Sequence, residues 1–178
     1  MRRIREERGA SAVEFAIIAS LLLLILFGTI TFGITFNRIQ GLQSSAREGS
    51  RLGSLSQTTV DQIVTRSLDS VSILNSSNFM TGGGGGSIRW CSGTLTFDTG
   101  CMTIETKQDT NKDGDYTDGG EVTTWTNGTD VPCGSTVAGT RKSLVVDVQY
   151  RIRIDIPFWA SPQMTASGTG EFACEKQS

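Results

Sequence analysis

The residues best suited to bind a ligand lie in the acidic stretch 109–121, which reads DTNKDGDYTDGGE. Asp109, Asn111 and Asp113 alternate along it and precede Gly114, as in the opening of an EF-hand calcium loop. Short oxygen side chains at this spacing can converge on Ca²⁺, and glycine permits the sharp turn between them. The twelfth position is Gly120, however, where an EF-hand requires a bidentate glutamate.

The missing glutamate leaves two interpretations of this stretch open. One is a calcium site of another type, with ligands drawn from Asp109, Asn111, Asp113, the backbone of Asp115, and Asp118 or Glu121. The other is a solvated acidic turn, because Asp-Gly and Gly-Gly pairs favour turns without any ion. Calcium is therefore a candidate cofactor, and the flanking patterns predict strands rather than the two helices of an EF-hand.

Other chemistry is restricted by what the 178-residue chain does not contain. It has no histidine, which excludes Ser–His and Cys–His pairs and histidine-ligated metals. No nucleophile motif stands out. A formal net charge of -2 gives no electrostatic footprint for nucleic acid. We therefore expect neither an enzyme nor a nucleic-acid-binding protein.

A long apolar segment, residues 15–36, reads FAIIASLLLLILFGTITFGITF and has no charged side chain. At ~1.5 Å per residue a helix of this length measures about 33 Å, close to the hydrocarbon thickness of a bilayer. The preceding residues MRRIREERG contain four arginines against two glutamates, so the positive-inside rule places the N-terminus in the cytoplasm. We expect a retained single-pass helix, because a cleaved secretory signal has a shorter apolar core and a small-residue cleavage site.

The cysteines all follow this segment, in the part of the chain predicted to lie outside the cytoplasm. An even number there indicates two disulfides, and zinc is disfavoured because no two cysteines have CxxC spacing. Three pairings are open, and four reduced thiols are the alternative. In one pairing the first two cysteines staple a hairpin and the last two tether the C-terminal strand: Cys91, Cys101, Cys133 and Cys174.

Hydrophobic periodicity predicts two helical regions after the apolar segment. Residues 37–56 are amphipathic and continue the apolar helix outward as one rod. Residues 60–74 form a second helix, for which Thr59 and Gln62 have the spacing of a capping box. Residues 75–87 contain five successive glycines and are predicted to be a flexible joint.

Beyond residue 88 the pattern changes to period two, which is typical of strands. It is clearest in 143–157, where apolar side chains occupy every even position from Leu144 to Ile156. We expect a small, mostly antiparallel sheet packed against the 60–74 helix, and so an α+β fold. The shorter predicted strands are 94–98, 102–106, 121–126 and 164–173.

Glu14 is the one acidic residue at the entrance of the apolar helix. An acidic group near the interface costs less than one at the bilayer centre, and a helix N-terminus favours an anion, so a simple interfacial carboxylate is one interpretation. The surrounding pattern indicates another: Gly9, four residues, Glu14 and the aromatic Phe15, then the long apolar run.

This pattern resembles prepilins of the tight-adherence (Tad, type IVc) pilus systems. The stretch RGASAVEFAIIASLLLLILFG, then Asn37-Arg38 and the segment SAREGSR at 45–51, is similar to the TadE-like family in particular. That family has an Ala-Arg-Glu-Gly-Ala-Arg-like sequence after its helix, and Ser50 stands where alanine is common. The resemblance covers residues 8–51, under a third of the chain.

The resemblance implies that a prepilin peptidase cuts after Gly9. Ala10 then becomes the N-terminus, and Glu14 becomes the fifth residue of the mature chain. It further implies that Glu14 pairs with the N-terminal amine of a neighbouring subunit, where two charges in an apolar filament core stabilise each other. Its implied partners are other Tad pilins and minor pilins, the inner-membrane assembly platform and membrane lipid.

The sequence thus predicts a pilin-like component of Tad pilus biogenesis, a minor pilin or pseudopilin that supports assembly and adherence. The alternative is a single-pass, membrane-anchored extracytoplasmic module that binds calcium and mediates adhesion. We expect it in the bacterial cytoplasmic (inner) membrane with its C-terminal part outside. The predicted organisation is a cytoplasmic leader, 1–9, a transmembrane helix with its extension, 10–56, and an extracytoplasmic α+β domain, 57–178.

Overall fold

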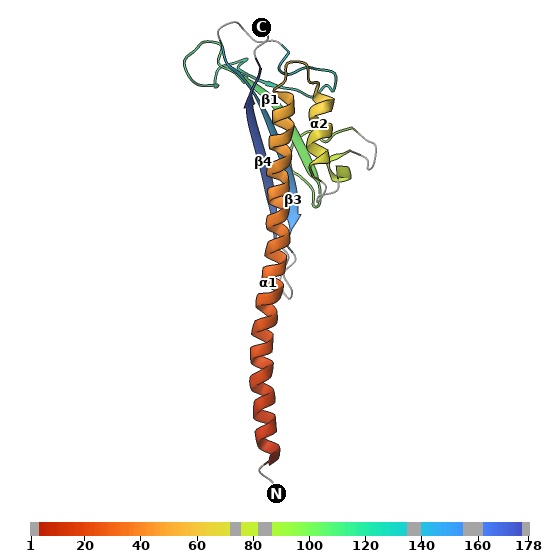
Figure 1. Cartoon of the computed structure of the whole chain (residues 1–178), viewed down its shortest axis with the longest axis vertical. Helices are drawn as coiled ribbons and strands as arrows, with labels where there is room; N and C mark the ends of the chain where they lie inside the picture. Colours follow the sequence, from red (N-terminus) through yellow and green to blue (C-terminus); the bar gives the residue numbers. More distant parts are fainter. Residues whose placement is uncertain (1–3, 72–75, 82–86, 135–139, 155–161, 176–178) are drawn as a thin grey trace.

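One helix dominates the computed structural model, which describes residues 4–71, 76–81, 87–134, 140–154 and 162–175. Helix α1, Ile4–Gly53, has 50 residues and continues without a break from the apolar segment into the amphipathic one (Figure 1). The predicted single rod is therefore confirmed. Its N-terminal half projects away from the rest of the chain, and its C-terminal half packs on the sheet.

The sheet has four antiparallel strands in the order β2-β1-β3-β4. They are β1, Gly100–Gln108; β2, Val122–Thr124; β3, Lys142–Arg153; and β4, Gln163–Ala173. The period-two pattern of 143–157 is confirmed for β3, where the even residues from Leu144 to Ile152 are buried. Residues 155–157 of that prediction lie outside the described residues. The α+β fold is confirmed.

The predicted strand 94–98 is wrong. Residues 97–98 form a turn in which Asp98 has a φ of 57°. The Thr99 hydroxyl donates locally to the Thr96 carbonyl, and the backbone-to-backbone hydrogen bonds between this stretch and β3 are made by Asp98 and Thr99. Threonine side chains that can satisfy nearby backbone groups compete with a ladder in this way.

The position of the second helix also differs from the prediction. Helix α2, Val60–Asp69, has the expected buried stripe, and the Gln62 side chain accepts a 3.0 Å hydrogen bond from the Thr59 amide. Residues 72–74 of the predicted helix lie outside the described residues. The sheet, however, is covered mainly by α1, and α2 packs against α1 rather than forming the main cover itself. A long rod with a buried stripe supplies more apolar surface than a helix of 10 residues.

Part of the predicted flexible joint belongs to the core. Residues 82–86, the glycine run, lie outside the described residues, but η2, a 3₁₀ helix at Ser76–Phe79, precedes them. Phe79 is fully buried, and its ring lies 5.7 Å from that of Tyr150. A Cβ on Gly100 would lie 2.2 Å from the Phe79 ring, so the start of β1 requires glycine there.

Both predicted disulfides are present. Cys133–Cys174 ties the end of β4 to the 130s loop, with 5.5 Å between the Cα atoms. Cys91–Cys101 has a Cα separation of 4.9 Å, but it does not staple a hairpin. Residues around Trp90 instead run parallel to β1. The Met102 amide donates to the Arg89 carbonyl, and the Cys91 amide donates to the Met102 carbonyl.

We expect the fold to lose stability at alkaline pH because of Tyr150. Burial, and then the hydrogen bond to the Asp98 carboxylate, raise the pKa of Tyr150 from 10.0 to about 12. A raised tyrosine pKa stabilises the fold fully below pH 10, and this stabilisation is lost as the pH rises toward 12. We expect the free energy of unfolding to fall across that interval, and to fall less in Tyr150→Phe. Denaturant titrations of both proteins at several alkaline pH values measure this, and equal slopes would contradict it.

Candidate assembly surface on α1

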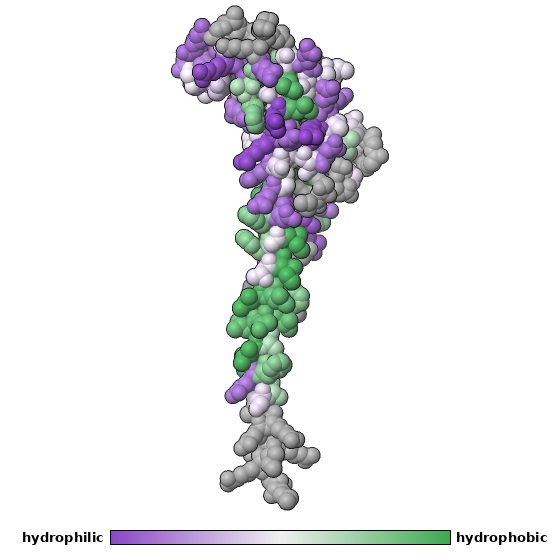
Figure 2. All heavy atoms as spheres, in the orientation of Figure 1, coloured by the Kyte–Doolittle hydropathy of each residue, from purple (hydrophilic) through white to green (hydrophobic). Residues whose placement is uncertain are grey.

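The N-terminal half of α1 exposes its apolar side chains on every side. Phe15 is 72% exposed, Leu24 71% and Phe32 72%, and the apolar surface runs down the helix from the base of the domain (Figure 2). The helix is long and apolar enough to cross a membrane, and none of its most apolar window is buried inside the chain. So much apolar surface in water would be very unfavourable, so α1 has the properties of a single-pass membrane anchor.

The hydroxyl groups in this half are compatible with lipid. Ser20 donates to the Ile17 carbonyl at 2.8 Å, Thr29 to Leu26 at 2.9 Å, and Thr35 to Thr31 at 2.9 Å. Each hydroxyl is therefore satisfied by the helix itself. Side chains that bond their own helix add no unpaired polar group to a hydrocarbon environment.

The predicted processing and assembly residues lie at the start of this helix. Gly9 and Ala10 lie in its first turns, and Glu14 and Phe15 follow within the same continuous helix. Glu14 is exposed, and no residue in the described parts of the chain forms an ion pair with it. The structure thus places an exposed carboxylate near the start of the apolar segment.

The C-terminal half of α1 meets α2 along a row of small residues. The Ser45 hydroxyl donates a hydrogen bond of 2.8 Å to the Ser67 carbonyl, and a Cβ on Gly49 would lie 2.0 Å from the Ser67 hydroxyl oxygen. A Cβ on Gly53 would lie 2.6 Å from Ile63. Ser45, Gly49 and Gly53 recur every four residues, so they share one helix face and allow α2 to approach closely.

The neighbouring face of α1 lies directly on β4. A Cβ on Gly168 would lie 2.4 Å from the Leu42 carbonyl, and one on Gly170 would lie 2.4 Å from the Ala46 carbonyl. The backbone of α1 therefore packs directly on Gly168 and Gly170 of β4, which have no side chains. The Ser50 hydroxyl is buried here and donates 2.8 Å to the Ala46 carbonyl, so its polar atom is satisfied.

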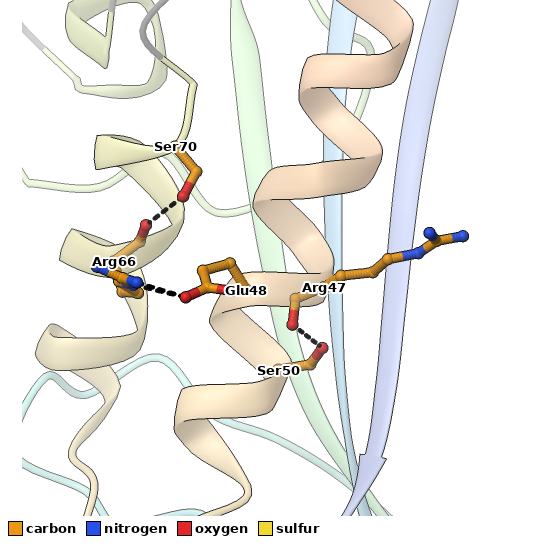
Figure 3. A network of polar contacts seen from close by, with 5 residues as sticks. All are labelled: Arg47, Glu48, Ser50, Arg66 and Ser70. Atoms are coloured by element: carbon orange, nitrogen blue, oxygen red, sulfur yellow. Dashed lines mark hydrogen bonds and ion pairs between the residues drawn. The ribbon is translucent and has the colours of Figure 1, made fainter.

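Glu48 links α1 to α2 at the surface. Arg66 donates to the Glu48 carboxylate through both Nε, at 3.0 Å, and Nη2 (Figure 3). The hydrogen bond and charge of Arg66 lower the pKa of Glu48. Exposed ion pairs of this kind contribute little to stability, so the close packing of the small residues accounts for most of the contact between α1 and α2. Arg47 points away from α2 (Figure 3), and both it and Arg51 are exposed.

These positions can be compared with known families. Residues 9–51 match the model of the TadE-like protein family. The match starts at Gly9 and ends two residues before α1 does, so the TadE-like segment contains both the exposed anchor and the row of small residues that seats the domain on it. The resemblance seen in the sequence is confirmed for this segment. No curated protein and no solved structure matches the chain.

The TadE-like segment now has a physical explanation. In its Ala-Arg-Glu-Gly-like part, Ala46 packs against β4 and Gly49 packs against α2. Glu48 accepts a hydrogen bond from Arg66. Ser50, which departs from the common alanine, is tolerated because its hydroxyl bonds the helix carbonyls of Ala46 and Arg47. The sequence pattern marks this segment but not its packing role, because the glycines of β4 that contact it, Gly168 and Gly170, lie far along the chain.

The acidic stretch does not form a cation cage in the part of the chain that the structure describes. There, no three acidic, cysteine or histidine side chains are arranged to hold one metal ion. Asp109 instead accepts from the amides of Lys112 and Gly114, and Asp115 from that of Thr117. These are the bonds of a self-contained turn, and the calcium prediction therefore rests on the sequence pattern alone.

Glu121 has a structural place in this stretch that the sequence did not reveal. It is 1% exposed, and its carboxylate accepts from the Thr110 amide at 3.0 Å and from the Asp118 amide at 3.3 Å. The two amides lie at opposite ends of the turn, so Glu121 closes it from the inside. A buried carboxylate is stabilised by such amide donors.

Proposed function

We propose that this protein is a minor pilin or pseudopilin-like component of Tad (type IVc) pilus biogenesis, with a structural rather than an enzymatic role. One observation supports the proposal most strongly. The TadE-like segment is an anchor whose apolar side chains are mostly exposed in the part of the chain that the structure describes, while its other half packs against the folded domain. Such a shape delivers a domain to a membrane and leaves the helix free to pack against other helices.

The proposal assigns a role to each part of the chain. Residues 1–9 are a cytoplasmic leader that a prepilin peptidase removes, 10–56 are the inner-membrane helix and its extension, and 57–178 are the extracytoplasmic domain. The oxidising exterior of a bacterial cell suits the two disulfides of that domain. Its partners are other pilins and minor pilins, and the assembly platform in the inner membrane.

We expect Gly9→Leu to block removal of the leader. A bulky side chain at the scissile bond would not fit a peptidase that accepts glycine, whereas Gly9→Ala changes the volume least. Mass spectrometry of the protein purified from cells with an active prepilin peptidase measures the N-terminus. Wild type should begin at Ala10, and Gly9→Leu should retain the leader.

The control is the same wild-type protein from cells that lack the peptidase, which should retain residues 1–9. If Gly9→Leu yields a chain that begins at Ala10, the peptidase does not recognise this site. If wild type retains the leader in the presence of the active enzyme, the processing proposal is wrong.

Glu14→Gln tests the assembly role separately. A carboxylate and an amine that are both removed from water stabilise each other, and deleting one member of such a pair costs about 3–5 kcal/mol. We therefore expect membrane insertion to be unchanged, but co-purification with pilin partners to fall by a factor of about a hundred or more. Glu14→Asp keeps the charge and should retain part of the association. Equal co-purification of wild type and Glu14→Gln would remove this role.

A further inference from the structure

The lower end of the sheet reaches the apolar part of α1. Gly168 of β4 lies against the backbone of Leu42. From Gly168, β4 extends back to its first residue, Gln163. These five residues, at ~3.3 Å each, cover about 17 Å. Along α1 the same distance corresponds to about 11 residues at ~1.5 Å each, which ends near residue 31. The partial burial of Thr31 and Thr35 agrees with this level, as does the direction of β3 in Figure 1.

This level lies inside the apolar segment 15–36. A bilayer core about 30 Å thick takes up about 20 residues of helix. A core that begins near Ser11, the first residue of the candidate membrane span, ends near residue 31 and leaves no stalk of α1 between membrane and domain. The end of the sheet, where β3 stops at Arg153 and β4 begins at Gln163, then lies at the height of the lipid headgroups.

The side chains at this end have the chemistry of a membrane interface. Phe97 is 45% exposed, and the Arg153 guanidinium lies 5.6 Å from the centre of its ring. Arg151 donates to the Leu95 carbonyl and holds the Phe97 turn against β3. Met164 is 38% exposed on the adjoining strand. Aromatic rings and arginines are the residues that settle between hydrocarbon and headgroups.

The charge at this end selects the kind of lipid. Arg38 lies two residues beyond the apolar segment, where its charge partly counteracts the rise in the pKa of Tyr150, whose hydroxyl donates to the carboxylate of Asp98. Among the residues that the structure describes here, Arg38, Arg151 and Arg153 share this end with one carboxylate, Asp98, which already accepts a hydrogen bond from Tyr150. Basic side chains at a membrane surface attract anionic lipids, each by about 1 kcal/mol.

We propose that the lower end of the sheet is a docking surface for anionic phospholipid headgroups, which holds the domain upright on the membrane. The surface consists of Arg38, Phe97, Arg151, Arg153 and Met164. The proposal rests on α1 being a membrane anchor, but it does not depend on leader removal or on pilus assembly. It therefore stands or falls independently of the Gly9 and Glu14 experiments.

Tryptophan quenching by lipid tests the proposal in the full-length chain. Phe97→Trp places a fluorescent aromatic at the docking surface, and Tyr116→Trp places one in the acidic stretch beyond the opposite end of β1. Both variants, and wild type as the background, are reconstituted into nanodiscs with phospholipid brominated just below the headgroup. We expect the added tryptophan at position 97 to be quenched and the one at position 116 to be unaffected. Equal quenching at both positions, or none at 97, would overturn the proposal.

The lipid charge is tested in the same system. Nanodiscs of phosphatidylcholine alone are compared with nanodiscs that also contain phosphatidylglycerol. We expect phosphatidylglycerol to increase the fraction of docked Phe97→Trp, and Arg153→Gln in that background to weaken docking about fivefold, the equivalent of about 1 kcal/mol. Lys107→Gln, near the far end of β1, is the matched control and should not alter docking. Quenching that is independent of both phosphatidylglycerol and Arg153 would overturn the anionic headgroup as the ligand.

Discussion

Gly168→Ala is expected to destabilise the domain by about 2 kcal/mol, because it separates α1 from the sheet. The added Cβ would lie 2.4 Å from the carbonyl carbon and oxygen of Leu42 and 2.5 Å from the amide nitrogen of Gln43. All three are backbone atoms, so no side-chain rotation relieves the overlap. The helix must move, and overpacking of this type costs about 1–3 kcal/mol or more. The entropic benefit of replacing glycine, about 0.4–1 kcal/mol, is smaller.

Gly41→Ala is the matched control for this substitution. Gly41 lies in α1 just before Leu42, and a Cβ there would meet nothing within 4 Å. Replacing a helical glycine with alanine should stabilise by about 0.5–1 kcal/mol. Denaturant unfolding in detergent, followed by tryptophan fluorescence, measures both variants. Equal stability of the Gly168 variant and wild type would show that α1 does not rest on β4.

Removing the Cys133–Cys174 disulfide is expected to cost about 4 kcal/mol. The two cysteines are 41 residues apart, and a closed loop of that length restricts the unfolded chain by about this amount. The bond also ties the end of β4 to the loop near Cys133, which is itself part of the core. The measurement is the unfolding free energy of Cys133→Ala/Cys174→Ala against that of wild type.

Cys91→Ala/Cys101→Ala provides the comparison, because its two cysteines are only 10 residues apart. The shorter loop should cost about 3 kcal/mol, less than the longer one. If the short-loop variant proves the less stable of the two, chain entropy does not account for the stabilisation. The contacts of Cys101, which is 2% exposed, would then be the main contribution.

Local patterns in the sequence were sufficient for the elements that a single segment determines. The 15–36 run has the length and apolarity of a membrane helix, and the alternation from Leu144 to Ile152 has the period of a half-buried strand. The spacing of Thr59 and Gln62 marked the start of α2. The TadE-like pattern likewise lies within one continuous helix. In each case the residues that carry the signal are also the residues that form the structure.

Only the tertiary structure decided which surfaces meet. That α1 rather than α2 covers the sheet depends on Gly168 and Gly170, whose missing side chains matter only because a helix more than 100 residues earlier in the chain lies on them. Phe79 is buried for a similar reason, since Gly100 and Tyr150 surround it. Glycine in a sequence indicates freedom or a turn, and it becomes a packing site only when a distant backbone comes close. The sequence alone determined the apolar helix and the long strand β3, whose signals are local, and the close approach of α1 to β4 decided how the domain is joined to that helix.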